Sequence, residues 1–127
     1  MIFKLLPGAD YRSAKQYGLA LDLSDDLRGA ISGSLTGVYD AHIPSGGYVL
    51  DSLRASLWCI ENSDSFESAV LLAVNLGDDA DTTAAITGQI AGAMYGYSTI
   101  PTALKDGLIG ERRLYVTSQF LSKVQID

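Results

Sequence analysis

The sequence has little of what marks disulfide-rich, basic or secreted proteins. It contains one cysteine, Cys59, in 127 residues, so no internal disulfide can form, and a reducing, cytoplasmic compartment fits best. Nine Lys and Arg residues against fifteen Asp and Glu give a net charge of −6, and this balance gives no electrostatic footprint for nucleic acid or anionic membranes. No sustained apolar run followed by small residues occurs at the N-terminus, so we expect no signal peptide.

Charge is absent from one segment, 82–104, whose 23 residues are long enough to span a bilayer. Within it Gly88, Gly92 and Gly96 recur every four residues, a spacing typical of closely packed helices. The segment also holds Gln89 and several threonines, and it has few large aliphatic side chains. A central helix of a helical protein therefore fits better than a membrane span, and we expect no membrane association.

The length and the 47% of apolar residues predict one globular domain over 1–127. Strand signals are nearly absent, whereas apolar residues recur at spacings of three and four, so the predicted fold class is all-α, a compact helical bundle. Residues 1–23 are expected to be irregular, with a turn at Pro7-Gly8, and 39–47 to form a loop. The predicted helices cover 24–38, 49–62, 64–76, 82–95, a short segment after Pro101, and 111–123.

Capping residues define several of these boundaries. Ser24 has the character of an N-cap, with acidic residues in the first turn that follows. Asp64 and Glu67 are spaced as a capping box, and Gly77 stands where a left-handed C-terminal cap is expected. Asp81 is the predicted cap of the next helix, which is expected to end at Gly96.

The chain concentrates negative charge in one loop between two apolar helices. Asp78, Asp79 and Asp81 lie within four residues and are followed by Thr82. Two carboxylates about 6 Å apart repel by about 3 kcal/mol at an effective dielectric constant of about 20, and a bound cation relieves that repulsion. An all-oxygen set of this kind suits Mg²⁺, Mn²⁺ or Ca²⁺. A solvated loop that merely caps a helix is the other interpretation, and spacing alone leaves both open.

Other reactive residue types have simpler explanations. His42, the only histidine, lies in a predicted loop, and Cys59 lies between apolar neighbours as a small buried hydrophobic residue. Glu61 and Glu67 stand near predicted helix ends, where capping and solvation explain them. We find no phosphate-binding loop, no zinc-ligand spacing and no G-x-S-x-G elbow.

Two stretches together resemble a known family. V-N-L-G-D-D-A-D-T-T-A-A-I-T-G-Q-I-A-G-A-M-Y-G (74–96) resembles the C-terminal metal-binding signature of the ADP-ribosylglycohydrolases, in particular the branch that removes ADP-ribose from dinitrogenase reductase. S-G-G-Y-V-L-D-S-L-R-A-S-L-W (45–58) is similar to that branch's S-G-Y-V-x-D-T-L-x-A-x-L-W segment. Ile100-Pro101 matches the I-P pair that follows the signature helix.

The resemblance implies an all-α hydrolase with a two-metal Mg²⁺ or Mn²⁺ centre. Its D-x-D-T motif implies Asp79, Asp81 and Thr82 as metal ligands. The implied metals hold the ribose of ADP-ribose and orient water for cleavage of the glycosidic bond. By the same resemblance Gly47 and Tyr48 lie beside the ligand, with the tyrosine ring available to the adenosine part, although ordinary packing also explains a tyrosine at the start of a helix.

The sequence departs from the family pattern by an absence. The G-D-x-x-G and T-D-D-T motifs that supply the family's remaining metal ligands do not occur, and Ser24-Asp25-Asp26 fits a helix cap instead. The chain therefore resembles the C-terminal part of the family domain, in which we identify no catalytic residue. Two hypotheses follow: a hydrolase acting on an ADP-ribosylated protein or small molecule, or a non-catalytic remnant that binds ADP-ribose or a protein. An exposed apolar surface is expected either to bind an N-terminal half or to self-associate.

Overall fold

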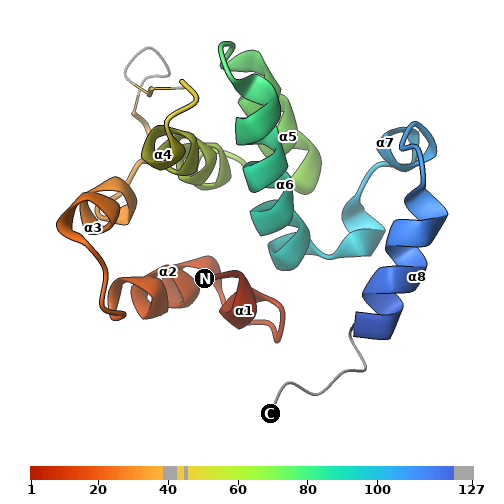
Figure 1. Ribbon diagram of the computed structural model, residues 1–127, viewed down its shortest axis with the longest axis horizontal. Helices are drawn as coiled ribbons and strands as arrows, with labels where there is room; N and C mark the ends of the chain where they lie inside the picture. Colours follow the sequence, from red (N-terminus) through yellow and green to blue (C-terminus); the bar gives the residue numbers. More distant parts are fainter. Residues whose placement is uncertain (39–42, 45, 122–127) are drawn as a thin grey trace.

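The computed structural model describes residues 1–38, 43–44 and 46–121, and every regular element in those ranges is a helix (Figure 1). The all-α prediction is confirmed. In chain order the elements are α1 (Ile2–Leu5), α2 (Tyr11–Leu19), α3 (Asp25–Ile31), α4 (Val49–Glu61), α5 (Phe66–Asn75), α6 (Ala80–Tyr95), the 3₁₀ turn η2 (Tyr97–Thr99), α7 (Thr102–Asp106) and α8 (Glu111–Leu121).

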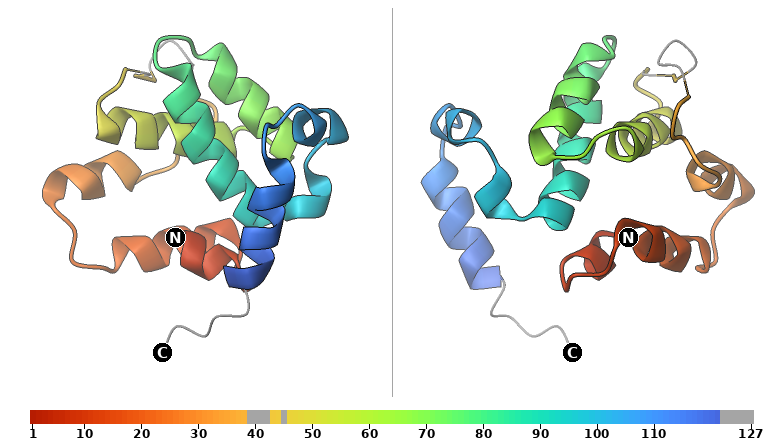
Figure 2. Two further views of the ribbon diagram at one scale, coloured as in Figure 1. Left: turned by 45° about the vertical axis from the view of Figure 1, so that its right-hand side comes forward. Right: turned by 180° about the vertical axis from the view of Figure 1, so that it is seen from behind.

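Helices α4, α5 and α6 form the centre of the molecule. α5 and α6 lie side by side as a hairpin, α4 packs against both, and α1 also touches α6 (Figures 1 and 2). α4 is buried along almost its whole second half, 55–60, because it lies between α3 and the hairpin. Apolar residues of α5 and α6 complete this core, namely Phe66, Ala69, Ala73, Ile90 and Ala91.

The central helices agree with the predictions, with small shifts at their caps. Gly77 and Gly96 end α5 and α6 with φ values of +80° and +86°, as expected of glycine at these positions. The capping box of α5 uses Ser65 with Ser68, so the box predicted from the acidic residues Asp64 and Glu67 was wrong by one register. α6 begins two residues earlier than predicted, and its N-cap is Asp79 rather than the predicted Asp81.

The helix predicted over 24–38 is too long. Ser24 does cap α3, accepting the N–H of Leu27, but the helix ends at Ile31. The segment that follows leaves the helical path because it is hydrogen-bonded to the C-terminal end of α4. The N–H of Leu35 donates to a carboxylate oxygen of Glu61 over 2.7 Å, and Trp58 Nε1 donates to the Val38 carbonyl over 2.8 Å. Leu35 and Val38 therefore keep the apolar spacing of a helix although they lie in a non-helical segment.

Residues 1–23 are not irregular, contrary to the prediction. Two helices form there, and Asp10 caps the second by accepting the N–H of Ser13 over 3.0 Å. The turn predicted at Pro7-Gly8 is present, and Gly8 has a φ of +96°. α2 was missed because it buries a single residue, Ala14, and so shows no apolar stripe in the sequence.

Glu61 holds the N-terminal helices to α4, so the solvation proposed for it from the sequence was wrong. Its Oε1 accepts the Tyr11 hydroxyl over 2.9 Å and the Lys15 ammonium over 2.6 Å. Both charged side chains are nearly buried, at 11% exposed for Lys15 and 8% for Glu61. The same lysine also donates to the Gly33 carbonyl over 2.8 Å, which closes the network around the end of α4.

The C-terminal helices stand apart from the core (Figures 1 and 2). As predicted, a short helix follows Pro101, and α8 begins at Glu111; its predicted last residues, 122–123, lie outside the described residues. Neither α7 nor α8 contains a buried residue. Large apolar side chains of α8 are instead exposed, namely Leu114, Val116, Phe120 and Leu121.

The glycine-rich helix α6 does not behave as its spacing predicts. A Cβ added at Gly88 would meet no atom within 4 Å, and one at Gly92 would only touch the Phe66 ring at 4.0 Å, so close packing through these glycines is absent from the described part of the chain. None of the helices in that part has the length and apolar character that crossing a bilayer requires.

Candidate functional site

The acidic loop between α5 and α6 is a sharp turn at one end of the hairpin (Figure 1). Gly77 and Asp78 are both left-handed, with φ values of +80° and +49°, and Asp78 is the only non-glycine residue in the described ranges with a positive φ. This turn places Asp79 at the N-cap of α6 and Asp81 in its first turn. The positive end of the helix dipole therefore lies beside both carboxylates.

The two predicted acidic ligands are brought together. The Asp79 side chain is within hydrogen-bonding reach of Asp81, and this contact is the main reason that the pKa of Asp81 lies below its usual value. The N–H of Thr82 also donates to Asp81 Oδ1 over 2.9 Å. Asp81 and Thr82 are exposed, whereas Asp79 is half-buried. The carboxylates of Asp79 and Asp81 therefore lie close together at an accessible helix end.

Gly47, predicted to lie near the ligand, lies directly against one of these two residues, Asp79. A Cβ built on Gly47 would be 3.2 Å from Asp79 Oδ2, so the backbone approaches the carboxylate more closely than most side chains permit. The two residues are far apart in sequence and meet because α4 packs against α6. A turn of main chain therefore forms one wall beside the acidic pair.

Tyr48, the other residue predicted to contact the ligand, is 60% exposed and opens α4 as its N-cap. Its side chain is therefore accessible to solvent, on a surface that neither Asp79 nor Asp81 lines. It borders a shallow depression of about 410 Å³ that Arg54 and Asp51 of α4 and Asp26 of α3 also line. An exposed ring beside charged groups suits a flat polar ligand.

A row of buried polar side chains behind the site was missed by the sequence analysis. Ser52 and Ser56 of α4 and Thr83 and Thr87 of α6 are all at most 1% exposed. Their spacing of four residues on each helix, in otherwise apolar segments, is the signal that would have found them. We call these four residues the polar seam.

Cys59 extends this seam, and its predicted burial is confirmed. Burial raises the pKa of its thiol to about 11, although a contact with the Thr87 side chain lowers it. A thiol with such a pKa is protonated at neutral pH and is a poor nucleophile. Cys59 is therefore a packing residue.

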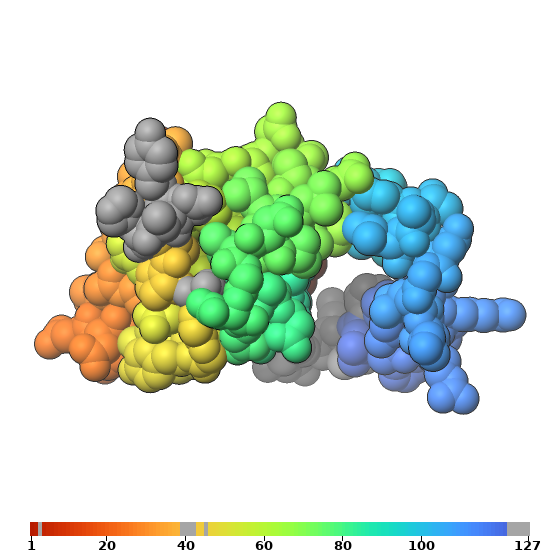
Figure 3. All heavy atoms as spheres, turned by 90° about the horizontal axis from the view of Figure 1, so that it is seen from above, coloured from red at the N-terminus to blue at the C-terminus, as the bar shows by residue number. Residues whose placement is uncertain are grey.

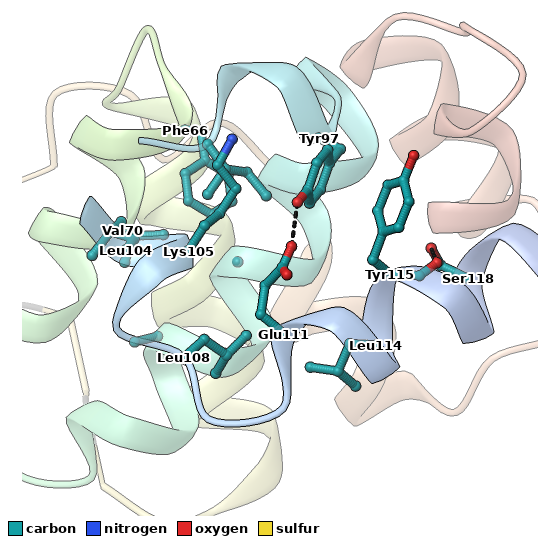
Figure 4. Close-up of a pocket in the computed structure, with 13 residues that line it drawn as sticks. Phe66, Val70, Tyr97, Leu104, Lys105, Leu108, Glu111, Leu114, Tyr115 and Ser118 are labelled. Atoms are coloured by element: carbon teal, nitrogen blue, oxygen red, sulfur yellow. Dashed lines mark hydrogen bonds between the residues drawn. The ribbon is translucent and has the colours of Figure 1, made fainter. Parts of the chain in front are cut away.

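An apolar cavity of about 410 Å³ lies elsewhere, between the α5–α6 hairpin and the segment 97–118. Figure 3 shows the hollow between these parts, and Figure 4 shows its lining, in which the Tyr97 hydroxyl donates to Glu111. The rings of Tyr97 and Tyr115 also meet there, with centroids 5.4 Å apart. Neither acidic ligand lines this cavity, so it is separate from the candidate metal site.

The donor set fits a hard divalent cation only in part. Asp79 and Asp81 supply carboxylate oxygens and Thr82 a hydroxyl, which are ligands that Mg²⁺ and Mn²⁺ accept. No cluster of three His, Cys, Asp or Glu side chains suited to a metal occurs within residues 1–38, 43–44 and 46–121. His42 lies outside the described residues. A metal ion bound here would therefore need ligands beyond these three residues.

Comparison with known proteins identifies the family. The family model for ADP-ribosylglycohydrolase matches residues 2–125. The chain is 57% identical over 72 residues to the ADP-ribosylarginine hydrolase of Serratia proteamaculans (strain 568), which is 57% of this chain and 20% of that protein. It is 41% identical over 58 residues to the ADP-ribosyl-[dinitrogen reductase] glycohydrolase of Rhodospirillum rubrum, which is 46% of this chain and 20% of that protein.

A solved structure shares the fold. The chain superposes on a protein described as an ADP-ribosylglycohydrolase-related protein complex with a TM-score of 0.75 and 33% sequence identity. The match covers 88% of this chain and 39% of the other. The chain thus spans about a fifth of the length of the curated relatives it matches and less than half of this structural neighbour.

Proposed function

Because the chain belongs to the ADP-ribosylglycohydrolase family, we propose that it supplies the C-terminal part of a hydrolase that removes ADP-ribose from a modified protein. In this proposal Asp79, Asp81 and Thr82 bind Mg²⁺ or Mn²⁺. The observation that carries it is the close approach of the Gly47 backbone to the Asp79 carboxylate, which brings the two family-like stretches of the sequence into one site. A location in the reducing cytoplasm is part of the proposal, since the one cysteine is a free, buried thiol.

The proposed reaction is hydrolysis of an N-glycosidic bond. Water adds to the anomeric carbon of the ribose, the bond from that carbon to the modified side chain breaks, and a proton passes to the leaving nitrogen. A divalent cation bound at the site would supply electrostatic stabilisation of the ribose oxygens and of the water. An arginine linkage is the first to test, because a relative that is 57% identical is an ADP-ribosylarginine hydrolase.

The residues of this chain have distinct roles in that reaction. The carboxylates of Asp79 and Asp81 would bind the cation at the N-terminus of α6, where the helix dipole alone favours an anion. Gly47 lets the backbone lie next to the carboxylate, and the exposed ring of Tyr48 offers a stacking surface to the adenosine part.

The second candidate is a non-catalytic module that binds ADP-ribose or a protein partner. Two observations favour it: the acidic pair lacks further acidic or histidine ligands in the described residues, and α8 exposes an apolar face. A module of this kind would use Tyr48 and the Gly47 turn for the nucleotide without cleaving a bond.

Calorimetric titration with Mn²⁺ and Mg²⁺, with and without ADP-ribose, tests the first candidate. We expect binding that ADP-ribose strengthens and that the double substitution Asp79→Ala with Asp81→Ala abolishes. Asp22→Ala with Asp25→Ala is a matched control, since these exposed acids lie just before and at the start of α3, outside the acidic loop and outside the depression beside Tyr48. Equal loss in the control pair would contradict the ligand assignment.

Release of ADP-ribose from an ADP-ribosylarginine protein separates the two candidates. Metal-dependent release by the chain supports the hydrolase. Binding of ADP-ribose without release supports the module, and the absence of both metal and ADP-ribose binding in the millimolar range contradicts the proposed site.

A further inference from the structure

The polar seam is costly for a helix interface. A buried hydroxyl must find a hydrogen-bond partner, whereas alanine fills nearly the same volume without that demand. Elsewhere in the same two helices alanine does occupy buried positions, Ala55 in α4 and Ala91 in α6. Close packing alone therefore does not explain serine at positions 52 and 56.

Ser52 reaches out of its helix to the turn that carries Gly47. Its hydroxyl lies 3.1 Å from the carbonyl oxygen of Gly46 and 3.3 Å from that of Tyr48, and it donates its one proton to either. The two carbonyls stand on both sides of Gly47. With 1% of its surface exposed, Ser52 makes these bonds without competition from water.

Ser56 continues the connection from α4 to α6. Its hydroxyl lies 2.7 Å from the Ser52 carbonyl oxygen and 3.1 Å from that of Thr83. The N–H of Thr83 in turn donates to the Asp79 carbonyl oxygen over 3.1 Å. Main chain and hydroxyls thus link the Gly47 turn to Asp79 through the interior of the protein (Figure 2 shows the two helices).

We propose that Ser52 is a positioning residue, which holds the turn 46–48 against Asp79 and so fixes the shape of the candidate metal site. The inference rests on the proposed function for its relevance to metal and ADP-ribose. Its structural content, that the Ser52 hydroxyl orders the turn, stands without a metal. Ser56 links α4 to α6, since the carbonyl oxygens near its hydroxyl belong to Ser52 and Thr83.

Backbone order parameters from ¹⁵N relaxation of the metal-free chain test this content. We expect Ser52→Ala to lower the values at Gly46 and Gly47 to below about 0.6, the range of flexible backbone. Ser52→Thr keeps the hydroxyl and is expected to restore them. Ser52→Cys replaces the hydroxyl with a thiol, which is a weak donor, and it carries the same test if Ser52→Ala does not fold. Unchanged order parameters in these donor-deficient variants would overturn the proposal.

Ser68→Ala is the matched control, because that serine belongs to the capping box of α5 at the other end of the hairpin. It removes a hydrogen-bonded hydroxyl and lowers thermal stability without touching the turn 46–48. We expect its order parameters at Gly46 and Gly47 to equal those of the wild type. Equal loosening of the turn in both variants would show a general loss of structure and would also overturn the proposal.

Mn²⁺ titration of the same variants links the position to the site. We expect Ser52→Ala to weaken Mn²⁺ binding about tenfold, the lower end of the effect of residues that orient ligands, and Ser68→Ala to leave it unchanged. Should the wild-type chain bind no Mn²⁺, the proposed function fails, while the order parameters still decide the role of Ser52. The two failures are therefore distinguishable.

Discussion

The backbone of Gly47 lies so close to the Asp79 carboxylate that an added methyl group would come within 3.2 Å of Oδ2. A contact of that length requires the neighbour to give by a few tenths of an ångström, and here the neighbour is a predicted metal ligand. A side chain at position 47 would therefore press against the Asp79 carboxylate, and this effect does not depend on the backbone conformation of residue 47.

Gly47→Ala is expected to weaken Mn²⁺ binding about tenfold, because the methyl group displaces the Asp79 carboxylate. The free energy of unfolding should change by less than about 1 kcal/mol, since the position is exposed and alanine reduces the entropy of the unfolded chain. Gly46→Ala is the control, as a Cβ there meets no atom within 4 Å. Titration calorimetry and urea denaturation measure both quantities, and equal affinities for the two variants would contradict the prediction.

Glu61→Gln is expected to lower the free energy of unfolding by about 3 kcal/mol, because it leaves the charge of Lys15 nearly buried without its counter-ion. The amide also replaces an acceptor of three hydrogen bonds with a weaker one. Glu67→Gln removes the same charge from an exposed position in the first turn of α5 and should change stability by less than about 0.5 kcal/mol. Urea denaturation at neutral pH compares them, and a loss for Glu61→Gln no larger than for Glu67→Gln would refute the role of the network.

Protonation of Glu61 should lower the stability of the protein in acid. Burial raises the pKa of Glu61, but the hydrogen bonds that it accepts, first of all from Lys15, outweigh burial and hold the pKa below its ordinary value of 4.5. A lowered pKa in the folded state stabilises the protein above the unfolded pKa, and this contribution is lost as pH falls through the folded pKa. We expect the stability difference between wild type and Glu61→Gln to be constant above about pH 5.5 and to shrink below pH 4.5. A difference that stayed constant down to pH 3 would contradict this.

Thr83→Val is expected to raise the free energy of unfolding by up to about 1 kcal/mol, because Thr83 Oγ1 is buried without a hydrogen-bond partner among the described residues. Valine has the same shape and removes the unsatisfied oxygen. Thr87→Val should have the opposite effect, since the Thr87 hydroxyl donates to the Thr83 carbonyl over 2.8 Å. Thermal unfolding of both variants checks the opposite signs; destabilisation by Thr83→Val would mean that its hydroxyl has a partner.

The exposed apolar face of α8 predicts self-association of the chain at micromolar concentration. Phe120 is 70% exposed and Val116 58%, and their spacing of four residues puts them on one side of α8, so the double substitution Val116→Gln with Phe120→Gln removes this face. We expect sedimentation velocity to show a dimer or larger species for the wild type and a monomer for the variant. Leu71→Gln, which changes an exposed leucine of α5, is the control and should leave the association intact. A monomeric wild type would contradict the prediction.

Local sequence patterns predicted the central helices because each carries its own signals. α4 and α6 combine apolar periodicity with end residues that favour a start or a stop, Gly77 adopts the left-handed conformation expected of it, and Gly96 ends α6 as expected. α2 was not predicted because a helix that buries only Ala14 shows no apolar periodicity in the sequence. α3 was extended too far because Leu35 kept the helical spacing although it packs in a turn.

The sequence by itself determined the all-α class, the acidic turn and the family, because these depend on residues that are neighbours in the chain. Only the tertiary structure decided that Gly47 meets Asp79, that the Ser52 hydroxyl bonds to a carbonyl oxygen next to Gly47, and that Glu61 binds the N-terminal helices to α4. Two of these contacts, Gly47 with Asp79 and Glu61 with Lys15, join residues that are tens of positions apart in the sequence. Their partners are selected by how the helices pack, and the periodicity of any one helix does not record that choice.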